Sequence, residues 1–266
     1  MADRLKDKSV VVVGAGQTPG ESIGNGRAMA ILFAREGADV LCVDRNGDRA
    51  EETAAMIAAE DGRAAGLTAD IVKAADCAAI VAAARARFGR IDILVNNVGI
   101  GGRDGPAHRL EEAGFDRILA VNLKGMWLTI KAAVPLMREQ GGGSIVNISS
   151  LAAIAGGNQM AYEVSKAAVN RLTTSVASSN ARHGVRCNAL MPGFMDTPMA
   201  VEGIAQASGR TTKEVRDARN AQVPLGGKMG TAWDTAYAAL FFASDESRFI
   251  TGTVLAVDGG MSTRMG

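Results

Sequence analysis

Cysteine, histidine and aromatic residues are scarce in this sequence. Three cysteines and two histidines stand among 266 residues, and they are too few and too widely spaced for a disulfide framework or a His/Cys zinc site. Basic and acidic residues nearly cancel, at 29 against 28, so the cationic excess that nucleic-acid binding normally needs is also missing. We therefore expect a reduced protein with no bound metal and no nucleic-acid partner.

Long apolar runs are absent as well. The charged first residues are not followed by the apolar run of a secretory signal. The one uncharged stretch long enough to cross a bilayer, from Gln140 to Tyr162, is full of Gly, Ser and Asn and is typical of a strand followed by a loop. We expect a cytoplasmic protein with no membrane partner.

Glycine, in contrast, is abundant, with 32 residues beside only 6 prolines. A coiled coil would not carry so much glycine, and collagen would carry it at every third position together with abundant proline. The glycines are therefore expected at particular turns, where the backbone needs conformations that other residues rarely adopt.

Short apolar runs alternate with longer alanine-rich segments along the whole chain. Residues 10–13 are four consecutive valines, as expected of a strand buried on both faces of a parallel sheet. This alternation, without a linker, predicts a single domain over residues 1–266, a Rossmann-type doubly wound parallel α/β sheet of about seven strands flanked by helices. The expected strands are Ser9–Val13, Val40–Val43, Ala64–Leu67, Ile91–Val95, Ser144–Ile148, Val185–Ala189 and Val254–Val257. The expected helices are Gly26–Arg35, Arg49–Glu60, Ala74–Phe88, Phe115–Glu139, Ala161–His183 and Ala232–Ala243.

One segment, residues 195–230, interrupts this alternation. It has no strand signal, and a polar stretch of mixed charge runs through it from Arg210 to Arg219. Insertions of this length in compact domains usually form lids or binding loops, so we expect a substrate-binding lid. A solvated pair of surface helices is the alternative.

A glycine-rich turn follows the first expected strand, from Gly14 to Gly26. Such a turn lets the backbone approach a pyrophosphate and directs the amino-terminal N–H groups of the next helix towards it. The spacing does not fit the G-x-G-x-x-G fingerprint, because the residue three beyond Gly16 is Pro19. The turn alone therefore leaves a merely structural role open.

Asp44 ends the second expected strand. A carboxylate at this position can accept hydrogen bonds from both hydroxyls of an adenosine ribose and repels the 2′-phosphate of NADP, which favours NAD. Arg45 follows directly and could receive such a phosphate, and an Asp here could instead cap the next helix. We expect NAD as the cofactor, with NADP less favoured.

Tyr162 and Lys166 are four residues apart on an expected helix, so they share one face. Ser149 and Ser150 end the preceding expected strand, and side chains at the carboxyl edge of a parallel sheet face the ligand crevice. A tyrosine with its ordinary pKa of about 10 is a poor base near neutral pH, and an ammonium group one turn away favours the phenolate. The pattern therefore predicts a tyrosine activated for proton transfer.

These residues resemble those of the short-chain dehydrogenase/reductase family, and the resemblance covers essentially the whole chain. One motif of this kind could be accidental, but seven in the right order are not. The motifs are Asp70-Ile71, Asn96-Asn97-Val98-Gly99, Asn122 in V-N-L-K-G, Ile148-Ser149-Ser150, Tyr162-x-x-x-Lys166, Pro192-Gly193 followed by Thr197, and Val257-Asp258-Gly259-Gly260.

The chain departs from the family pattern in the glycine-rich turn. The family's usual motif is T-G-x-x-x-G-x-G, but here a valine replaces the Thr, and the last two glycines, Gly24 and Gly26, come six residues late. The stretch S-I-G-N-G-R-A instead resembles the S-I-A-x-G-x-A turn of the family's enoyl-reductase branch, in which the Ser and Ile reach the cofactor. The resemblance thus implies that Gly14, Ser22 and Ile23 bind the cofactor.

The second departure concerns the serine of the site. Ser150 stands twelve residues before Tyr162, one fewer than the family most often has. Counting back from Tyr162 would select Ser149, whereas counting forward from Asn122 and aligning the strand select Ser150. A one-residue deletion in the intervening loop is simpler than a slipped strand, so Ser150 is the predicted residue.

The resemblance implies a Ser-Tyr-Lys(-Asn) site. In it, Tyr162 exchanges the proton of the alcohol and Ser150 holds the substrate oxygen. Lys166 lowers the pKa of Tyr162 and binds the nicotinamide ribose, and Asn122 supports a water-linked proton path behind the lysine. The resemblance places Tyr162, like Lys166, among the residues that also bind the cofactor. The further cofactor residues that it implies are Asp70 and Ile71 at the adenine, Asn96 near the adenosine-side ribose, Gly99, and Met195 and Thr197 at the carboxamide.

The sequence as a whole predicts an NAD-dependent dehydrogenase that interconverts a small-molecule secondary alcohol and a ketone, in a homotetramer as the family implies. Two alternatives stay open: an NADPH-dependent carbonyl or 3-oxoacyl reductase, and a catalytically silent dinucleotide-binding sensor. Asp44 argues against the first. The joint presence of Asn122, Ser150, Tyr162 and Lys166 argues against the second. An enoyl reductase is disfavoured because that branch spaces its Tyr and Lys differently.

Overall fold

The computed structural model describes residues 3–263 and is built around a parallel sheet with the strand order β3-β2-β1-β4-β5-β6-β9. Every neighbouring pair in this sheet is parallel. The strands are β1 (Ser9–Val13), β2 (Asp39–Asp44), β3 (Arg63–Thr68), β4 (Ile93–Asn96), β5 (Gly143–Ile148), β6 (Val185–Pro192) and β9 (Val254–Val257). The doubly wound parallel α/β fold predicted from the sequence is confirmed.

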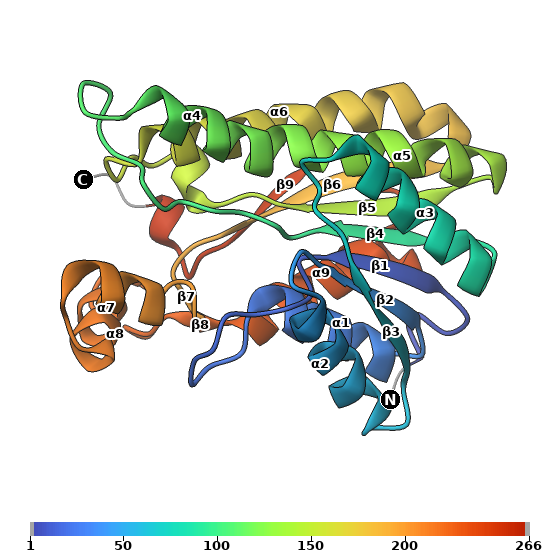
Figure 1. Ribbon diagram of the computed structural model, residues 1–266, viewed down its shortest axis with the longest axis horizontal. Coiled ribbons are helices and arrows are strands. Elements are labelled where there is room, and N and C mark those ends of the chain that lie inside the picture. The colour runs from blue at the N-terminus through green and yellow to red at the C-terminus, as the bar shows by residue number, and fades with distance from the viewer. Residues whose placement is uncertain (1–2, 264–266) are drawn as a thin grey trace.

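Helices cover both faces of the sheet (Figure 1). On one face lie α1 (Asn25–Arg35), α2 (Gly47–Ala58) and α9 (Ala232–Ala243), and on the other α3 (Ala74–Phe88), α5 (Met126–Glu139) and α6 (Met160–Asn180). Successive side chains of a strand point to opposite faces, so Val10 and Val12 enter the first core and Val11 and Val13 the second. None of the helices within residues 3–263 combines the length and the apolar character needed to cross a membrane.

The path of the chain through the sheet determines where a ligand can bind. The chain passes from β1 outward to β3 and then crosses back to β4, on the other side of β1. Ligands of doubly wound folds bind where the strand order reverses, beyond the carboxyl ends of the two central strands. The segments that follow these strands contact each other, because the side-chain amide of Asn97 donates to the carbonyl of Gly14 at 2.9 Å.

The prediction of a single helix from Phe115 to Glu139 is wrong in detail. The segment consists of α4 (Glu112–Leu119), a π-helical turn, η1 (Ala120–Gly125), and α5. A π-helical turn widens the hydrogen-bond ladder by one residue without interrupting the helix, so the apolar periodicity of the side chains does not reveal it. The turn carries Asn122.

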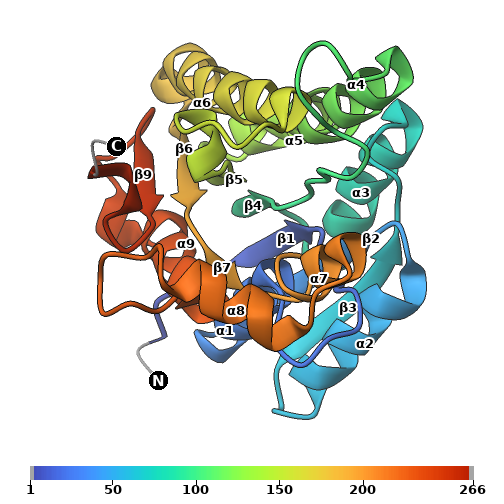
Figure 2. The same ribbon diagram turned by 90° about the vertical axis from the view of Figure 1, so that its left-hand side faces the viewer.

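Residues 195–230 were expected to lack strands, and this is also wrong. Two strands of two residues each, β7 (Met195–Asp196) and β8 (Gly230–Thr231), pair in parallel. Between them lie α7 (Glu202–Ser208) and α8 (Thr212–Asn220), which pack on a small apolar cluster of their own. Figure 2 shows both helices on the side of the molecule that faces the viewer. Strands of two residues are too short to produce a recognisable sequence pattern.

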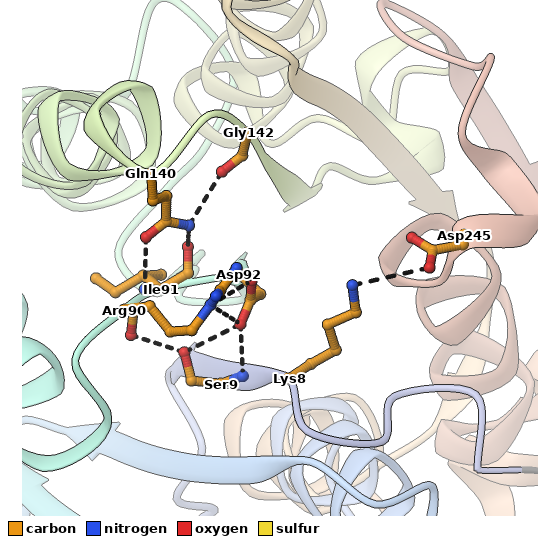
Figure 3. Close-up of polar contacts among 8 residues, drawn as sticks. All are labelled: Lys8, Ser9, Arg90, Ile91, Asp92, Gln140, Gly142 and Asp245. Atoms are coloured by element: carbon orange, nitrogen blue, oxygen red, sulfur yellow. Dashed lines mark hydrogen bonds and ion pairs between the residues drawn. The ribbon is translucent and has the colours of Figure 1, made fainter.

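A network of hydrogen bonds and ion pairs joins the segments at the amino-terminal edge of the sheet (Figure 3). The carboxylate of Asp92 accepts a hydrogen bond from the backbone of Ser9 at 2.9 Å and pairs with Arg90 at 2.7 Å. The side chain of Gln140 donates to the carbonyl of Ile91 at 2.6 Å and accepts from its N–H at 3.2 Å. These contacts fix the strand ends on the side opposite to the crevice.

Candidate active site

Three predicted site residues come together at the carboxyl edge of the sheet. Tyr162 and Lys166 lie one turn apart on α6, with the Lys166 ammonium 5.6 Å from the centre of the tyrosine ring. Ser150 follows β5 directly and forms a side-chain hydrogen bond with Tyr162. The Ser150 hydroxyl also accepts from the backbone of Ala152 at 3.2 Å, which holds it at the start of a short 3₁₀ turn.

The two neighbouring serines have different surroundings. The Ser149 side chain is buried, and its hydroxyl donates to the carbonyl of Lys166 at 3.1 Å. It therefore ties β5 to α6 and does not face the crevice. Ser150 is only partly buried and lies beside Tyr162. The geometry favours Ser150 as the serine that would meet a substrate oxygen.

Lys166 is a buried cation. Its side chain is 2% exposed, and its ammonium donates to the carbonyl of Ile148 at 2.8 Å. Burial disfavours the charged form and lowers the pKa of Lys166 to about 8. A Cβ atom at Gly99 would come within 3.0 Å of the ammonium nitrogen, so a glycine at this position leaves the lysine its space.

The pKa of Tyr162 reflects opposing influences. Burial raises it above the ordinary value, while the hydrogen bond with Ser150 and the positive charge of Arg219 lower it. Both of the lowering influences stabilise the phenolate. Arg219 belongs to α8, and the sequence analysis gave it no role beyond its place in a charged stretch.

Asn122 holds the loop after β4 against the helical layer. The side chain of Asn122 is fully buried. Its amide oxygen accepts from the N–H of Ile100 at 2.8 Å. Its amide nitrogen donates to the carbonyl of Ile100 at 2.9 Å and to the hydroxyl of Ser165 at 3.0 Å. The Ser165 hydroxyl in turn donates to the carbonyl of Tyr162 at 2.7 Å. Both N–H donors of the Asn122 amide are thus used inside the protein, and the π-helical turn that carries this residue is of a kind frequent at functional sites.

Asp104 positions the start of α6 from a distant part of the chain. Its carboxylate accepts hydrogen bonds from the N–H groups of Ala161 at 3.1 Å and Tyr162 at 2.8 Å, and from that of Gly105 at 2.8 Å. The first N–H groups of a helix need acceptors, and a negative charge there is favoured. Sequence reasoning missed this residue because helix caps are normally local, and the local residue, Gln159, makes no side-chain cap.

The turn after β1 fits the pyrophosphate of a dinucleotide. Gly14 has a φ of +84°, and a Cβ atom at Gly26 would collide with the Gly14 carbonyl, so the turn and α1 approach closely. The hydroxyl of Ser22, just before α1, is buried and has no hydrogen-bond partner among the described residues. Ile23 beside it packs against the first core. An orphaned hydroxyl at a helix amino terminus suits phosphate oxygens.

Asp44 lies at the end of β2 next to this turn. One carboxylate oxygen accepts from the N–H of Gly16 at 3.2 Å and the other from that of Asn46 at 3.0 Å. The alternative that Asp44 caps the next helix is not what the structure shows, because Asn46 is the cap of α2 and accepts from the backbone of Arg49. The partly buried carboxylate is therefore held beside the expected ribose position.

The other residues expected near the adenosine, Asp70, Ile71 and Asn96, differ in what their side chains contact. The carboxylate of Asp70 accepts from the backbone of Val72 at 3.2 Å, and Ile71 is buried in the second core. The Asn96 amide donates to Asn147 at 2.9 Å and accepts from Thr129 at 2.7 Å, all inside the protein. Protein groups thus engage the Asn96 amide, and its contact near the adenosine-side ribose stays a prediction.

Met195 and Thr197 lie where the lid begins. Both side chains are buried. Met195 is in β7 and its backbone pairs with Gly230, and the carbonyl of Thr197 accepts from the backbone of Ala200 and Val201 at 2.9 Å each. Both residues therefore lie in the connection between β6 and α7.

An ionic contact joins the lid to the lengthened loop before α1. The Arg216 guanidinium on α8 lies 2.8 Å from the carboxylate of Glu21, 3.1 Å from that of Asp196 and 3.8 Å from that of Glu202. The backbone of Glu21 also donates to Glu202 at 3.0 Å. The extra residues of the loop therefore pack on the lid.

The cysteines lie outside this site. Cys42, Cys77 and Cys187 are free and buried, and burial raises the pKa of the Cys42 and Cys187 thiols to about 12. Across residues 3–263 no three His, Cys, Asp or Glu side chains are placed to hold a metal ion together.

The known proteins similar to this chain are described as dehydrogenases or reductases. A family model described as Enoyl-(Acyl carrier protein) reductase matches residues 20–262. The 2-(S)-hydroxypropyl-CoM dehydrogenase 3 of Xanthobacter autotrophicus is 39% identical over 265 residues, covering 98% of this chain and 99% of its own length. Levodione reductase of Leifsonia aquatica is 35% identical over 262 residues, covering 97% and 96%. A crystal structure described as a short-chain dehydrogenase/reductase from Burkholderia xenovorans has a TM-score of 0.90 at 40% identity, covering 99% of both chains.

Proposed function

This chain belongs to the short-chain dehydrogenase/reductase family and is an oxidoreductase with a nicotinamide dinucleotide cofactor, NAD or NADP, and we propose that it interconverts a secondary alcohol and a ketone with NAD(H). The whole chain, residues 1–266, acts as one catalytic domain with a lid at about residues 195–230. The observation that carries the proposal is the meeting of Ser150, Tyr162 and Lys166 at the carboxyl edge of the sheet.

The proposed chemistry assigns one task to each side chain. When bound, the nicotinamide ring supplies the hydride acceptor or donor. Tyr162 takes the proton of the alcohol, or returns it to the ketone oxygen, at its phenolic oxygen. Ser150 holds the substrate oxygen by a hydrogen bond, and the Lys166 ammonium favours the phenolate and binds the nicotinamide ribose. Asn122 supports the proton path behind Lys166 through its main chain.

NAD is the proposed cofactor because of the charge at the end of β2. Asp44 is held beside the glycine-rich turn by two backbone N–H groups, where its carboxylate would accept from the adenosine ribose and repel a 2′-phosphate. The pyrophosphate would lie over Gly14, Ser22 and Ile23. The other proposed cofactor contacts are Asp70 and Ile71 at the adenine, the backbone of Asn96, Gly99, and Met195 and Thr197 at the carboxamide.

Steady-state rates with NADH and NADPH on a panel of ketones test the proposal. The wild type should use NADH with a kcat/KM at least about tenfold above that for NADPH, and Asp44→Ser should reduce this ratio about tenfold or more. The exposed Asp48→Ser is the matched control and should leave the ratio unchanged. A preference of the wild type for NADPH would instead identify an NADPH-dependent carbonyl or 3-oxoacyl reductase.

Tyr162→Phe separates an enzyme from a silent dinucleotide-binding sensor. The variant should bind NADH with the affinity of the wild type and lose at least about a hundredfold in kcat, as expected for removal of a general acid or base. Full turnover by Tyr162→Phe would refute the mechanism. Absence of any change in absorbance at the NADH band with the wild type, across alcohols and ketones, would support the sensor.

A homotetramer is the proposed assembly. Among the exposed large apolar side chains, two groups lie on separate elements: Tyr237, Phe249 and Leu255 around α9 and β9, and Trp127 and Val164 on α5 and α6. Phe249 is 99% exposed, which is unusual for a side chain of this size unless another surface covers it. Two distinct self-complementary faces generate a tetramer of dihedral symmetry. Light scattering coupled to gel filtration tests this assembly.

The cytoplasm is the proposed location, with a small-molecule substrate. The three cysteines are free and buried, which fits a reducing compartment. Fractionation of the native cells checks this location.

A further inference from the structure

Arg219 places a cation at the crevice from the lid side. The guanidinium carbon lies 3.8 Å from the centre of the Phe194 ring, and its Nε donates to the sulfur of Met229 at 3.3 Å. Phe194 comes two residues after the end of β6. A planar guanidinium stacked on an aromatic face is held in one plane, so the group is oriented before any ligand arrives.

The charge of Arg219 has no ion-pair partner of its own among the described residues. The charge of Asp196 raises the pKa of Arg219, but the carboxylate of Asp196 pairs with Arg216. Arg216, one turn earlier on α8, contacts Glu21, Asp196 and Glu202. Arg219 forms no ion pair within 4.0 Å in the part of the chain described, and its two terminal nitrogens make no hydrogen bond there. A thioether sulfur is only a weak acceptor, so most of the donor capacity of this partly buried guanidinium is unused. Burial accordingly lowers the pKa of Arg219.

The unpaired cation is within electrostatic reach of the reacting hydroxyl. The positive charge of Arg219 lowers the pKa of Tyr162, and Tyr162 in turn raises that of Arg219. Ser150 and Phe194 follow the carboxyl ends of the neighbouring strands β5 and β6. The guanidinium stacked on Phe194 therefore lies at the same edge of the sheet as Ser150, within reach of a substrate whose oxygen is held there. A partly desolvated cation is stabilised when a bound oxyanion completes its hydrogen bonds.

We propose that Arg219 binds an anionic group of the substrate, so that the natural substrate is an alcohol or ketone carrying a carboxylate, sulfonate or phosphate. This inference rests on the proposed function, because it places the substrate by the Ser150 and Tyr162 contacts. A guanidinium can bind such an oxyanion through two parallel N–H donors. The same chemistry is present in the pyrophosphate of the cofactor, and the experiment must distinguish these two sources.

Matched pairs of ketones test the proposal. The substrates are acetoacetate against methyl acetoacetate, and 4-acetylbenzoate against methyl 4-acetylbenzoate, which place the anion near to and far from the carbonyl. The wild type should reduce the anion with a higher kcat/KM than the ester in at least one pair. Arg219→Met should lower the ratio of anion to ester by about 10- to 100-fold, the factor of a lost charged hydrogen bond, and Arg219→Lys should restore part of it. Arg210→Met, an exposed arginine of the same lid, should leave the ratio unchanged.

A binding measurement keeps this test separate from the proposed mechanism. Calorimetric titration of the same anions into the NAD-loaded protein should show binding that Arg219→Met loses and Tyr162→Phe keeps, even if turnover follows another route. No preference for the anion in either pair, in rate or in binding, overturns the proposal. A loss of NADH affinity in Arg219→Met, with anion and ester affected equally, would assign the guanidinium to the cofactor phosphates and also overturn it.

Discussion

Removing the buried cation of Lys166 should stabilise the cofactor-free protein while abolishing its chemistry. Lys166→Met retains the length and apolar stem of the side chain but carries no charge. The pKa of Lys166 is lowered from 10.5 to about 8 by burial alone, so the folded protein without cofactor holds this ammonium at a disadvantage relative to the unfolded chain. At about 1.4 kcal/mol per pH unit, the difference amounts to roughly 3 kcal/mol.

The net gain is smaller because the methionine gives up a hydrogen bond. The Lys166 ammonium donates to the carbonyl of Ile148 at 2.8 Å, and losing such a bond costs about 1 kcal/mol. Lys166→Met should therefore raise the free energy of unfolding at pH 7 by about 2 kcal/mol. Between the folded pKa of about 8 and the unfolded value of 10.5, only the unfolded chain keeps the proton, so the stability of the wild type rises with pH through this window. By pH 10 the free energy of unfolding of the wild type should have risen by roughly 2.5 kcal/mol. The greater stability of Lys166→Met should then have disappeared.

Urea unfolding of the cofactor-free proteins, followed by circular dichroism at pH 7 and pH 10, measures both effects. The exposed Lys124→Met is the control and should show no such dependence on pH relative to the wild type. The reasoning is refuted if Lys166→Met is less stable than the wild type at pH 7, or if the gap between them does not change with pH. Activity should be lost at every pH, because the phenolate of Tyr162 loses its neighbouring ammonium.

Three further predictions follow from the contacts. Ser150→Ala should lower kcat at least about a hundredfold and destabilise by at most about 1 kcal/mol, because the hydroxyl accepts from Ala152. Ser149→Ala should lose about 1 kcal/mol in urea unfolding and keep kcat within about threefold. Gly26→Ala, which puts a methyl group into a backbone carbonyl, should destabilise by about 3 kcal/mol or prevent folding, and Gly102→Ala, which faces open space, should not; thermal unfolding compares them. Asp104→Ala should lose about 1 to 2 kcal/mol by removing the cap of α6 and should also lower kcat, with Asp104→Asn intermediate in both; equal melting temperatures would contradict the cap.

The elements of the sheet were predictable because each strand carries its own pattern. β1 and β9 begin and end where the sequence places them, since runs of consecutive apolar residues end at glycine in one case and at aspartate in the other. The elements of residues 195–230 were harder to predict from the sequence. The capping box of Thr211 and Glu214 at the start of α8 was a local signal that could have identified this helix. β7 and β8 have none, because they form only when distant residues meet.

The candidate site likewise contains some residues that the sequence pattern identifies and others that it does not. Tyr162 and Lys166 share a helical face by spacing alone, so sequence reasoning could pair them. Asp104 and Arg219 act on the same tyrosine from a loop and from the lid, and nothing in their local sequence marks either residue. The surroundings of Asn96 were equally hidden from the sequence: it ends a strand, and Asn147 and Thr129, which are distant in the sequence, engage its amide inside the sheet.

The lengthened loop before α1 and the proposed anion site are linked through one helix. The lengthened loop before α1 is held by Arg216, through Glu21, and the unpaired guanidinium of Arg219 lies three residues further along α8. Residues three apart lie on neighbouring turns of one helix face, so the position of α8 fixes the cofactor-side loop and the substrate-side cation together. A loop of ordinary family length would lack Glu21 and leave this end of α8 without its anchor. The insertion therefore has a physical reason in the lid: it holds in place the helix that presents Arg219 to the crevice.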